Sequence, residues 1–342
     1  MKKILFVILF FPLLAVAQTV TEGQFTLIYS LPKTEFEITA DVERITETPG
    51  EFYQYSERYL ATSDVITSKR VYFRLKSLQL TPKTVADPDR TYTIIPSKRS
   101  LISLLTVNDQ GILCGINVPP SKIEKDVQIE RKSNKPVRST KKLLPLTEEY
   151  MLAGSVAKMA EGAARHIYRI RENKVDLLAG DVEYVPTDGA SMKTMIEQMD
   201  EQEKELTNLF TGTTTVENIT QKITFVPTEG VNDKILFRFS SFEGVVSADD
   251  LSGEPYYISI NYNPIKVEPV EKKRRVKEEV LTIIPVSAQV SLFNNDKVFY
   301  NSELIIPQLG DLMPLPLKTM DKKSRAYVSP ETGRFLTIEK NL

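Results

Sequence analysis

Short runs in which apolar and polar side chains alternate residue by residue recur along most of this 342-residue chain. They restrict it to a fold rich in half-buried strands. In residues 34–42, for example, Phe36, Ile38 and Ala40 fall on one face of an extended strand. Strands with one solvated face are typical of antiparallel sheets, because parallel sheets are covered on both faces. Pro82 is expected to end the run at 71–80. The other runs that fit a strand are 24–30, 92–95, 101–107, 221–226, 234–240, 256–262, 281–284, 287–293 and a terminal hairpin at 326–329 and 334–338.

Two longer stretches show apolar residues at steps of three and four, which is the period of an amphipathic helix. The first helix is predicted at about 148–173, with Thr147 as its N-cap. The second is predicted at about 188–210, and Gly212 follows its end as a helix-terminating glycine. A short helix is also expected at 51–60. The sequence therefore predicts an α+β fold, mainly antiparallel β with a central helical pair.

The chain is expected to form two lobes joined by a basic segment. Residues 18–130 would form an N-terminal β-rich lobe, and residues 143–342 a C-terminal lobe that contains both helices and further strands. Residues 131–142 between them hold six basic residues and no acidic one. This composition favours an exposed linker or loop. The alternative is a basic arm that contacts an anionic surface such as lipid head groups.

Residues 1–17 have the organisation of a signal peptide. Lys2 and Lys3 precede an apolar run at 4–14, and an Ala-Val-Ala tripeptide that ends at Ala17 fits a signal peptidase site, so cleavage is predicted there. The apolar run is shorter than the roughly 20 residues of a membrane-spanning helix, and no later run approaches that length. No Cys follows the run, so a lipoprotein anchor is not expected. We expect a soluble bacterial protein of the periplasm or cell exterior; the alternative is an uncleaved N-terminal anchor.

The charge balance argues against a nucleic-acid-binding protein. The chain has 44 basic and 45 acidic residues, and removal of Lys2 and Lys3 leaves a net charge of −3. Proteins that bind nucleic acids through the phosphate backbone carry an excess of Lys and Arg. Nucleic acid is therefore not an expected partner.

Residues that could carry catalysis are few. Cys114 is the only cysteine and His166 the only histidine, so no disulfide and no site with several histidines can form within one chain. Both are interpreted as structural residues. Ser155 and Lys158 match the Ser-x-x-Lys core of penicillin-recognising enzymes, but the companion motifs of those enzymes are missing. We predict no catalytic residue, no metal ligand and no cofactor.

Three aromatic residues, Phe52, Tyr55 and Tyr59, share helical spacing and are the one candidate ligand-binding surface. Stacked on the surface, their rings could bind a sugar. Burial of each ring would stabilise the fold by about 1.5–3 kcal/mol, so core packing explains the same spacing without a ligand.

Several short motifs follow one another in order along most of the chain, at 29–34, 49–50, 55–60, 86–88, 170–172, 177–180, 188–189 and 203–212. Together they look like a family of uncharacterised exported bacterial proteins, domain of unknown function 4831. The resemblance implies an envelope or secreted setting in Gram-negative bacteria of the gut, and it implies no activity and no catalytic residues.

The function expected from these observations is that of a non-enzymatic envelope protein, a binding or assembly module for another envelope protein or a glycan. The alternative is a hydrolase of cell-wall or polysaccharide material. Such an enzyme would need two carboxylates that converge across a cleft, and acids that follow one another on a single helix usually form its solvated face. The acids in question are Glu197, Asp200, Glu201, Glu203 and Glu205.

Overall fold

The computed structural model of the chain confirms an α+β fold that is mostly antiparallel sheet, with two long helices in contact. It describes residues 18–21, 24–95, 102, 104–119, 153–182, 188–264, 279–315, 320–321 and 323–340. The predicted signal peptide at 1–17 and the basic segment at 131–142 lie outside these residues. None of the helices in the described ranges is both long enough and apolar enough to cross a membrane.

Two unusually long strands form the axis of the molecule. Strands β2 (Gln24–Thr48) and β3 (Arg70–Ile94) have 25 residues each and pair along almost their whole length. At about 3.3 Å per residue, each would span roughly 80 Å if straight. Strand β6 (Thr213–Phe225) pairs with the other edge of β2, as does the short β1 (Gln18–Thr21). The predicted end of the strand at Pro82 is wrong. β3 lies at the edge of this sheet. A proline is tolerated on an edge strand when its nitrogen faces outward, because no neighbouring strand needs a hydrogen bond from that nitrogen.

A second sheet packs against the middle of this ribbon and makes a sandwich. Its order is β11 (Val298–Pro314), β10 (Leu281–Phe293), β9 (Glu254–Tyr262), β7 (Val231–Ser240) and β8 (Gly244–Val246). Apolar residues of both sheets are buried between them, and the alternation seen in the sequence is the reason. They include Phe36, Ile38, Leu80, Ile258, Val290 and Ile306.

A third, smaller sheet closes the end of the ribbon that lies away from the helices. It contains β4 (Leu105–Val107), β5 (Leu113–Ile116), β12 (Arg325–Val328) and β13 (Phe335–Glu339). β12 pairs with β5, just as β6 pairs with β2, so segments from both predicted lobes share sheets and cores. The division made along the sequence at 131–142 is therefore not a division between separate sheets.

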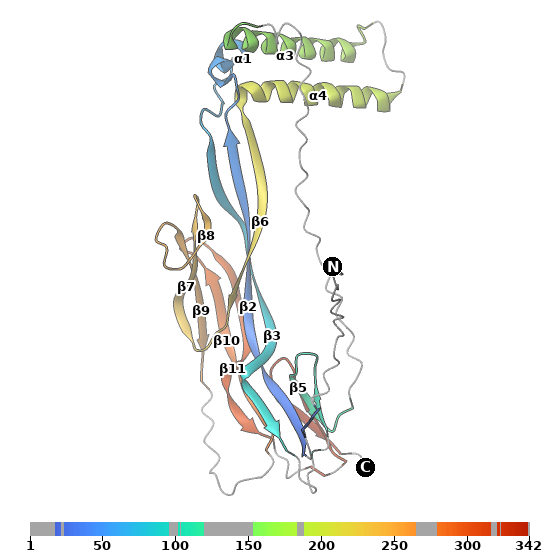
Figure 1. Cartoon of the computed structure of the whole chain (residues 1–342), viewed down its shortest axis with the longest axis vertical. Coiled ribbons are helices and arrows are strands. Elements are labelled where there is room, and N and C mark those ends of the chain that lie inside the picture. The colour runs from blue at the N-terminus through green and yellow to red at the C-terminus, as the bar shows by residue number, and fades with distance from the viewer. Residues whose placement is uncertain are drawn as a thin grey trace, which may run out of the picture.

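The helices lie together at the opposite end of the ribbon (Figure 1). They are the short η1 (Tyr53–Tyr55) and α1 (Ser56–Leu60) and the long α3 (Val156–Ala179) and α4 (Gly189–Thr211). The predicted bounds of α4 are confirmed within one residue. Those predicted for α3 are wrong at both ends, because Ser155 is its N-cap and the helix continues to Ala179 before Gly180. Thr147 lies outside the described residues.

Candidate functional site

The α3–α4 hairpin is anchored to the ribbon through the C-terminal end of α4. The carbonyls of residues 209–211 accept hydrogen bonds from the Phe52 N–H at 2.6 Å, the Ser56 hydroxyl at 2.9 Å and the Ile66 N–H at 2.9 Å. The last carbonyls of a helix have no partner inside the helix, so these bonds fill that need. The segment between β2 and β3 thus fixes where the hairpin lies.

Two glycines allow this close contact. A Cβ atom on Gly50 would lie 2.3 Å from the carbonyl oxygen of Leu209, and one on Gly212 would lie 2.6 Å from that of Thr48. Gly212 also has a φ of +89°, which side chains rarely tolerate. The backbone of α4 can therefore lie directly on the end of the ribbon.

The aromatic residues that were the candidate ligand surface form part of this anchor. Phe52 is completely buried, with its ring centroid 5.5 Å from that of Phe210. Tyr55 and Tyr59 are half-buried against the same cluster, and the Tyr59 carbonyl accepts a hydrogen bond from the Tyr168 hydroxyl at 2.9 Å. The structure brings the three residues together, as their spacing indicates, but in a core. A sugar-stacking surface that includes Phe52 is not what the fold presents.

Acids of α4 pair with bases of α3. Glu203 accepts hydrogen bonds from Arg171 at 2.6 Å and Lys174 at 2.8 Å, and Lys174 also bonds to Asp200 at 2.6 Å. Partial burial acts to raise the pKa of Glu203, but the two bonds to cations outweigh it and hold that pKa below its ordinary value. A general acid of a glycosidase needs the opposite shift. These carboxylates therefore hold the two helices together.

One face of the hairpin is left open, and we call it the open face. On α4, Met195, Gln202 and Leu209 are spaced by seven residues, so the three share a side of the helix. Leu209 packs in the anchor, beside Phe52, whereas Met195 lies farther out and is 39% exposed. Gln198, also exposed, lies on this side of the helix.

The matching side of α3 behaves in the same way. Ala164 is buried in the anchor and Tyr168 touches it, whereas Val175 and Leu178, which continue this side outward at helical spacing, are 64% and 65% exposed. Arg171 is the one charged residue in between, and it is bonded to Glu203. The open face is thus the outward continuation of a packed apolar face. Figure 1 shows the outer part of both helices projecting to one side of the ribbon.

The other residues singled out in the sequence have structural roles. Ser155 caps α3 by accepting a hydrogen bond from the backbone N–H of Lys158, while the Lys158 side chain is exposed. This cap gives Ser155 a structural role, and it needs no particular side chain at position 158. Burial raises the pKa of the Cys114 thiol, which disfavours the thiolate. His166 is half-buried on α3, and burial, followed by the charge of Arg169, lowers its pKa.

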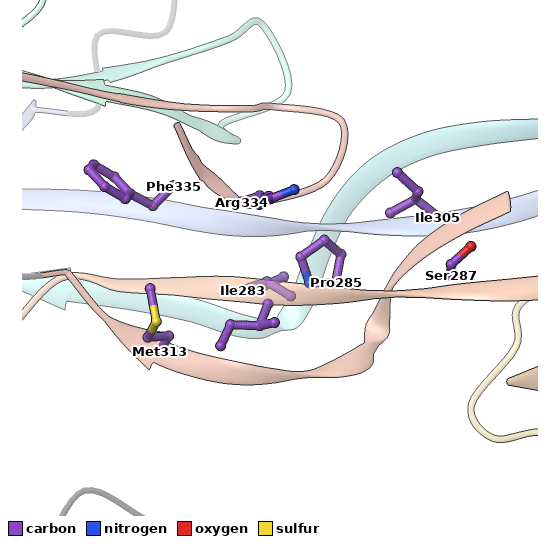
Figure 2. Close-up of a pocket in the computed structure, with 8 residues that line it drawn as sticks. Ile283, Pro285, Ser287, Ile305, Met313, Arg334 and Phe335 are labelled. Carbon is purple, nitrogen blue, oxygen red and sulfur yellow. The ribbon is translucent and has the colours of Figure 1, made fainter. Parts of the chain in front are cut away.

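A second candidate site is a cavity of about 550 Å³ at the other end of the sandwich. In Figure 2, Arg334 lies between Phe335 and Ile305, on the same side of β10 as Pro285. The sequence predicted neither this cavity nor β11, which supplies part of its wall, because 298–314 does not alternate regularly. The lining residues are Ile283, Ile284, Pro285, Ser287, Ile305, Met313, Arg334 and Phe335.

Comparison with known proteins gives a family and no activity. The model of the family described as Domain of unknown function (DUF4831) matches residues 26–335. No curated protein and no solved structure matches the chain. Within the described ranges, no group of three or more His, Cys, Asp or Glu side chains is placed to hold a metal ion.

Proposed function

The chain belongs to the family described as Domain of unknown function (DUF4831), whose description assigns no activity, and we propose a function from the geometry of its helical hairpin. The protein is an exported, non-enzymatic assembly module of the bacterial envelope. The open face of the hairpin binds another envelope protein, and the occupant is an amphipathic helix that lays an apolar stripe along α3 and α4.

The observation that carries this proposal is the exposure of Val175, Leu178 and Met195 on a face that is otherwise nearly uncharged. Full burial of an aliphatic side chain is worth about 1.5–3 kcal/mol, so covering these three would give several kcal/mol of favourable free energy. Two antiparallel helices leave a groove between them, and a third helix is the element that fits such a groove. Most of the other exposed side chains of α3 and α4 are charged or polar, and charged residues are depleted from the cores of protein interfaces.

The proposed location is supported by the sequence of residues 1–17 and not by the fold. The mass of the protein isolated from its own bacterium tests it. The expected mass is that of a chain that begins at Gln18, recovered in the envelope or culture fluid. A cytosolic protein that retains Met1 would refute export.

The proposed partner surface is tested by site-specific photo-crosslinking in intact cells. A benzophenone amino acid at position 178 lies on the open face, and the same probe at position 176, a partly exposed aspartate, points about 200° away around α3. The probe in place of Leu178 is expected to give one adduct heavier than the chain, and the probe in place of Asp176 none. Val175→Glu, added to the first variant, is expected to abolish the adduct.

Three outcomes would contradict this assignment. Equal adducts at both positions would mean contact without a specific face. No adduct at position 178 would mean that the open face has no partner. An adduct of twice the mass of the chain would identify a second copy as the occupant in place of another protein.

A further inference from the structure

The cavity between β10, β11 and the β12–β13 hairpin exists because the β10–β11 ladder is interrupted. Ile284 pairs with Asp311 and Val286 pairs with Ile306, so Pro285 alone faces the four residues 307–310. Proline cannot donate a ladder hydrogen bond, which makes this the natural place for the interruption. Three of these four residues have no counterpart on β10, so the segment leaves the ladder and β10 is uncovered there.

The displaced segment is held away from the cavity by the long ribbon. The Gln308 side chain accepts a hydrogen bond from the Thr34 N–H at 2.9 Å and donates one to the Thr34 carbonyl at 2.7 Å. Arg90 donates to the Gln308 carbonyl at 2.9 Å. Gly310 completes the bend, since a Cβ there would lie 2.1 Å from the Ile284 carbonyl oxygen. The interruption is therefore a fixed part of the fold.

The wall opposite β11 is also fixed. The Ile283 N–H donates to the Gly333 carbonyl at 2.8 Å, and the Gly333 N–H donates to the Ser329 carbonyl at 2.8 Å. Ser329 in turn donates its N–H to the Arg334 carbonyl at 2.9 Å. These bonds set the backbone of Arg334 at the rim of the cavity, where its side chain is exposed.

Among the lining residues that the structure describes, Arg334 is the one charged side chain, Ser287 is polar and the others are apolar. Ile305 is 52% exposed although it lines the cavity, which is a high value for an isoleucine beside a hydrophobic wall. Among the residues that the structure describes, no acidic side chain pairs with the Arg334 guanidinium. The site thus offers an apolar trough of a volume usual for small ligands, with a guanidinium at its edge that no acid of the described ranges neutralises.

From this arrangement we infer that the cavity binds an acyl chain that bears an anionic head group. The chain would lie over Ile283, Pro285 and Ile305, and the guanidinium of Arg334 would pair with a carboxylate or phosphate. Guanidinium matches both anions through two parallel N–H bonds. The inference is independent of the helical hairpin, because it uses the opposite end of the molecule. The head group can come from a free fatty acid or from a phospholipid, which share this chemistry.

Titration calorimetry on the mature chain, residues 18–342, tests the inference with three probes of equal alkyl length below their micellar concentrations. Dodecanoate and dodecyl phosphate are expected to bind, and dodecanol to bind at least tenfold more weakly. Tighter binding of dodecanoate would assign a fatty acid, and tighter binding of dodecyl phosphate a phospholipid. Equal affinity for dodecanol would overturn the role of Arg334.

Variants locate the binding at the cavity. Arg334→Gln is expected to lower the affinity for dodecanoate at least tenfold and to leave that for dodecanol unchanged. Ile305→Glu, at a position exposed enough to keep the fold, is expected to abolish binding of all three probes. Arg325→Gln, on β12 and outside the cavity lining, is the matched control and should bind like the unmodified chain. Unchanged binding in Arg334→Gln or Ile305→Glu, or no binding of either anion, would refute the inference.

Discussion

Substitution of Gly50 by alanine tests the anchor that fixes the hairpin to the ribbon. The new Cβ would lie 2.3 Å from the carbonyl oxygen of Leu209, 2.5 Å from its carbon and 2.7 Å from the carbonyl oxygen of Asn208. All three are backbone atoms and cannot rotate away. Since ordinary contact begins near 3.4 Å, α4 and the ribbon end must separate by about 1 Å. Overpacking of this kind costs about 1–3 kcal/mol.

The same displacement would also break a hydrogen bond. The Phe52 N–H lies 2.6 Å from the Leu209 carbonyl oxygen, and an added 1 Å takes this distance beyond hydrogen-bonding range. Loss of that bond adds about 1 kcal/mol, so Gly50→Ala is expected to destabilise the hairpin by about 2–4 kcal/mol in total.

Native-state hydrogen exchange of peptides from α3 and α4 measures this local stability. Exchange in Gly50→Ala is expected to accelerate about 30-fold or more, and peptides from the sandwich should change little. Gly162→Ala is the matched control, because Gly162 is inside α3 and its Cβ would meet no atom within 4 Å. It should slow exchange, since alanine favours a helix over glycine by about 1 kcal/mol. Unchanged or slower exchange in Gly50→Ala would refute the close approach of α4 to the ribbon.

Two further predictions concern the helices. Ser155→Ala is expected to destabilise the start of α3 by about 1 kcal/mol through loss of its cap, and Lys158→Ala to cost nothing; equal effects of the two in urea unfolding would contradict the capping role. Glu203→Gln is expected to lower hairpin stability at pH 7 and to differ less from the unmodified chain at pH 3. The lowered pKa of Glu203 contributes stability above its unfolded pKa of about 4.3, and this is lost as the pH falls through the folded pKa. Hydrogen exchange at both pH values measures this, and a constant difference would contradict the pairing with Arg171 and Lys174.

Local signals in the sequence were sufficient for the parts of the fold that depend on near neighbours. Asp188 and Gly212 mark both ends of α4, because caps act within one turn of a helix. The turn at 108–111 is also held by near neighbours, since the Asn108 side chain accepts the N–H of Ile112 at 2.9 Å. Alternation likewise placed most strands on the correct segments.

The predictions that are wrong concern features that depend on contacts between distant segments of the chain. Pro82 predicts the end of a strand unless it is known that β3 is an edge strand. Pro285 separates two predicted strands, whereas the structure has one bulged strand, β10. Thr147 and Ser155 both have a side chain that favours the N-cap position, and local pattern cannot choose between them, so the predicted start of α3 is wrong. Such choices are made by tertiary packing.

The candidate sites could not be predicted from the sequence for the same reason. Val175, Leu178 and Met195 look like core residues, and their exposure depends on how far the segment after β2 covers the hairpin. Nothing in the sequence near Arg334 indicates a binding site. Arg334 lies at a cavity because the β10–β11 ladder is interrupted at Pro285, about 50 residues earlier in the chain. Helical spacing did identify Phe52, Tyr55 and Tyr59 as a group, and their packing in the anchor is the outcome that burial energetics favours.

A pulsed electron paramagnetic resonance distance tests the central claim, that one continuous ribbon holds the hairpin away from the small end sheet. Spin labels on Val71→Cys and Thr93→Cys, with Cys114 replaced by alanine, sit on β3 opposite Thr46 and Ile28. These partners are 18 residues apart on β2, so the labels should be separated by about 50–60 Å. A separation below about 30 Å would mean that the chain folds back near Pro82, and the extended ribbon would be refuted.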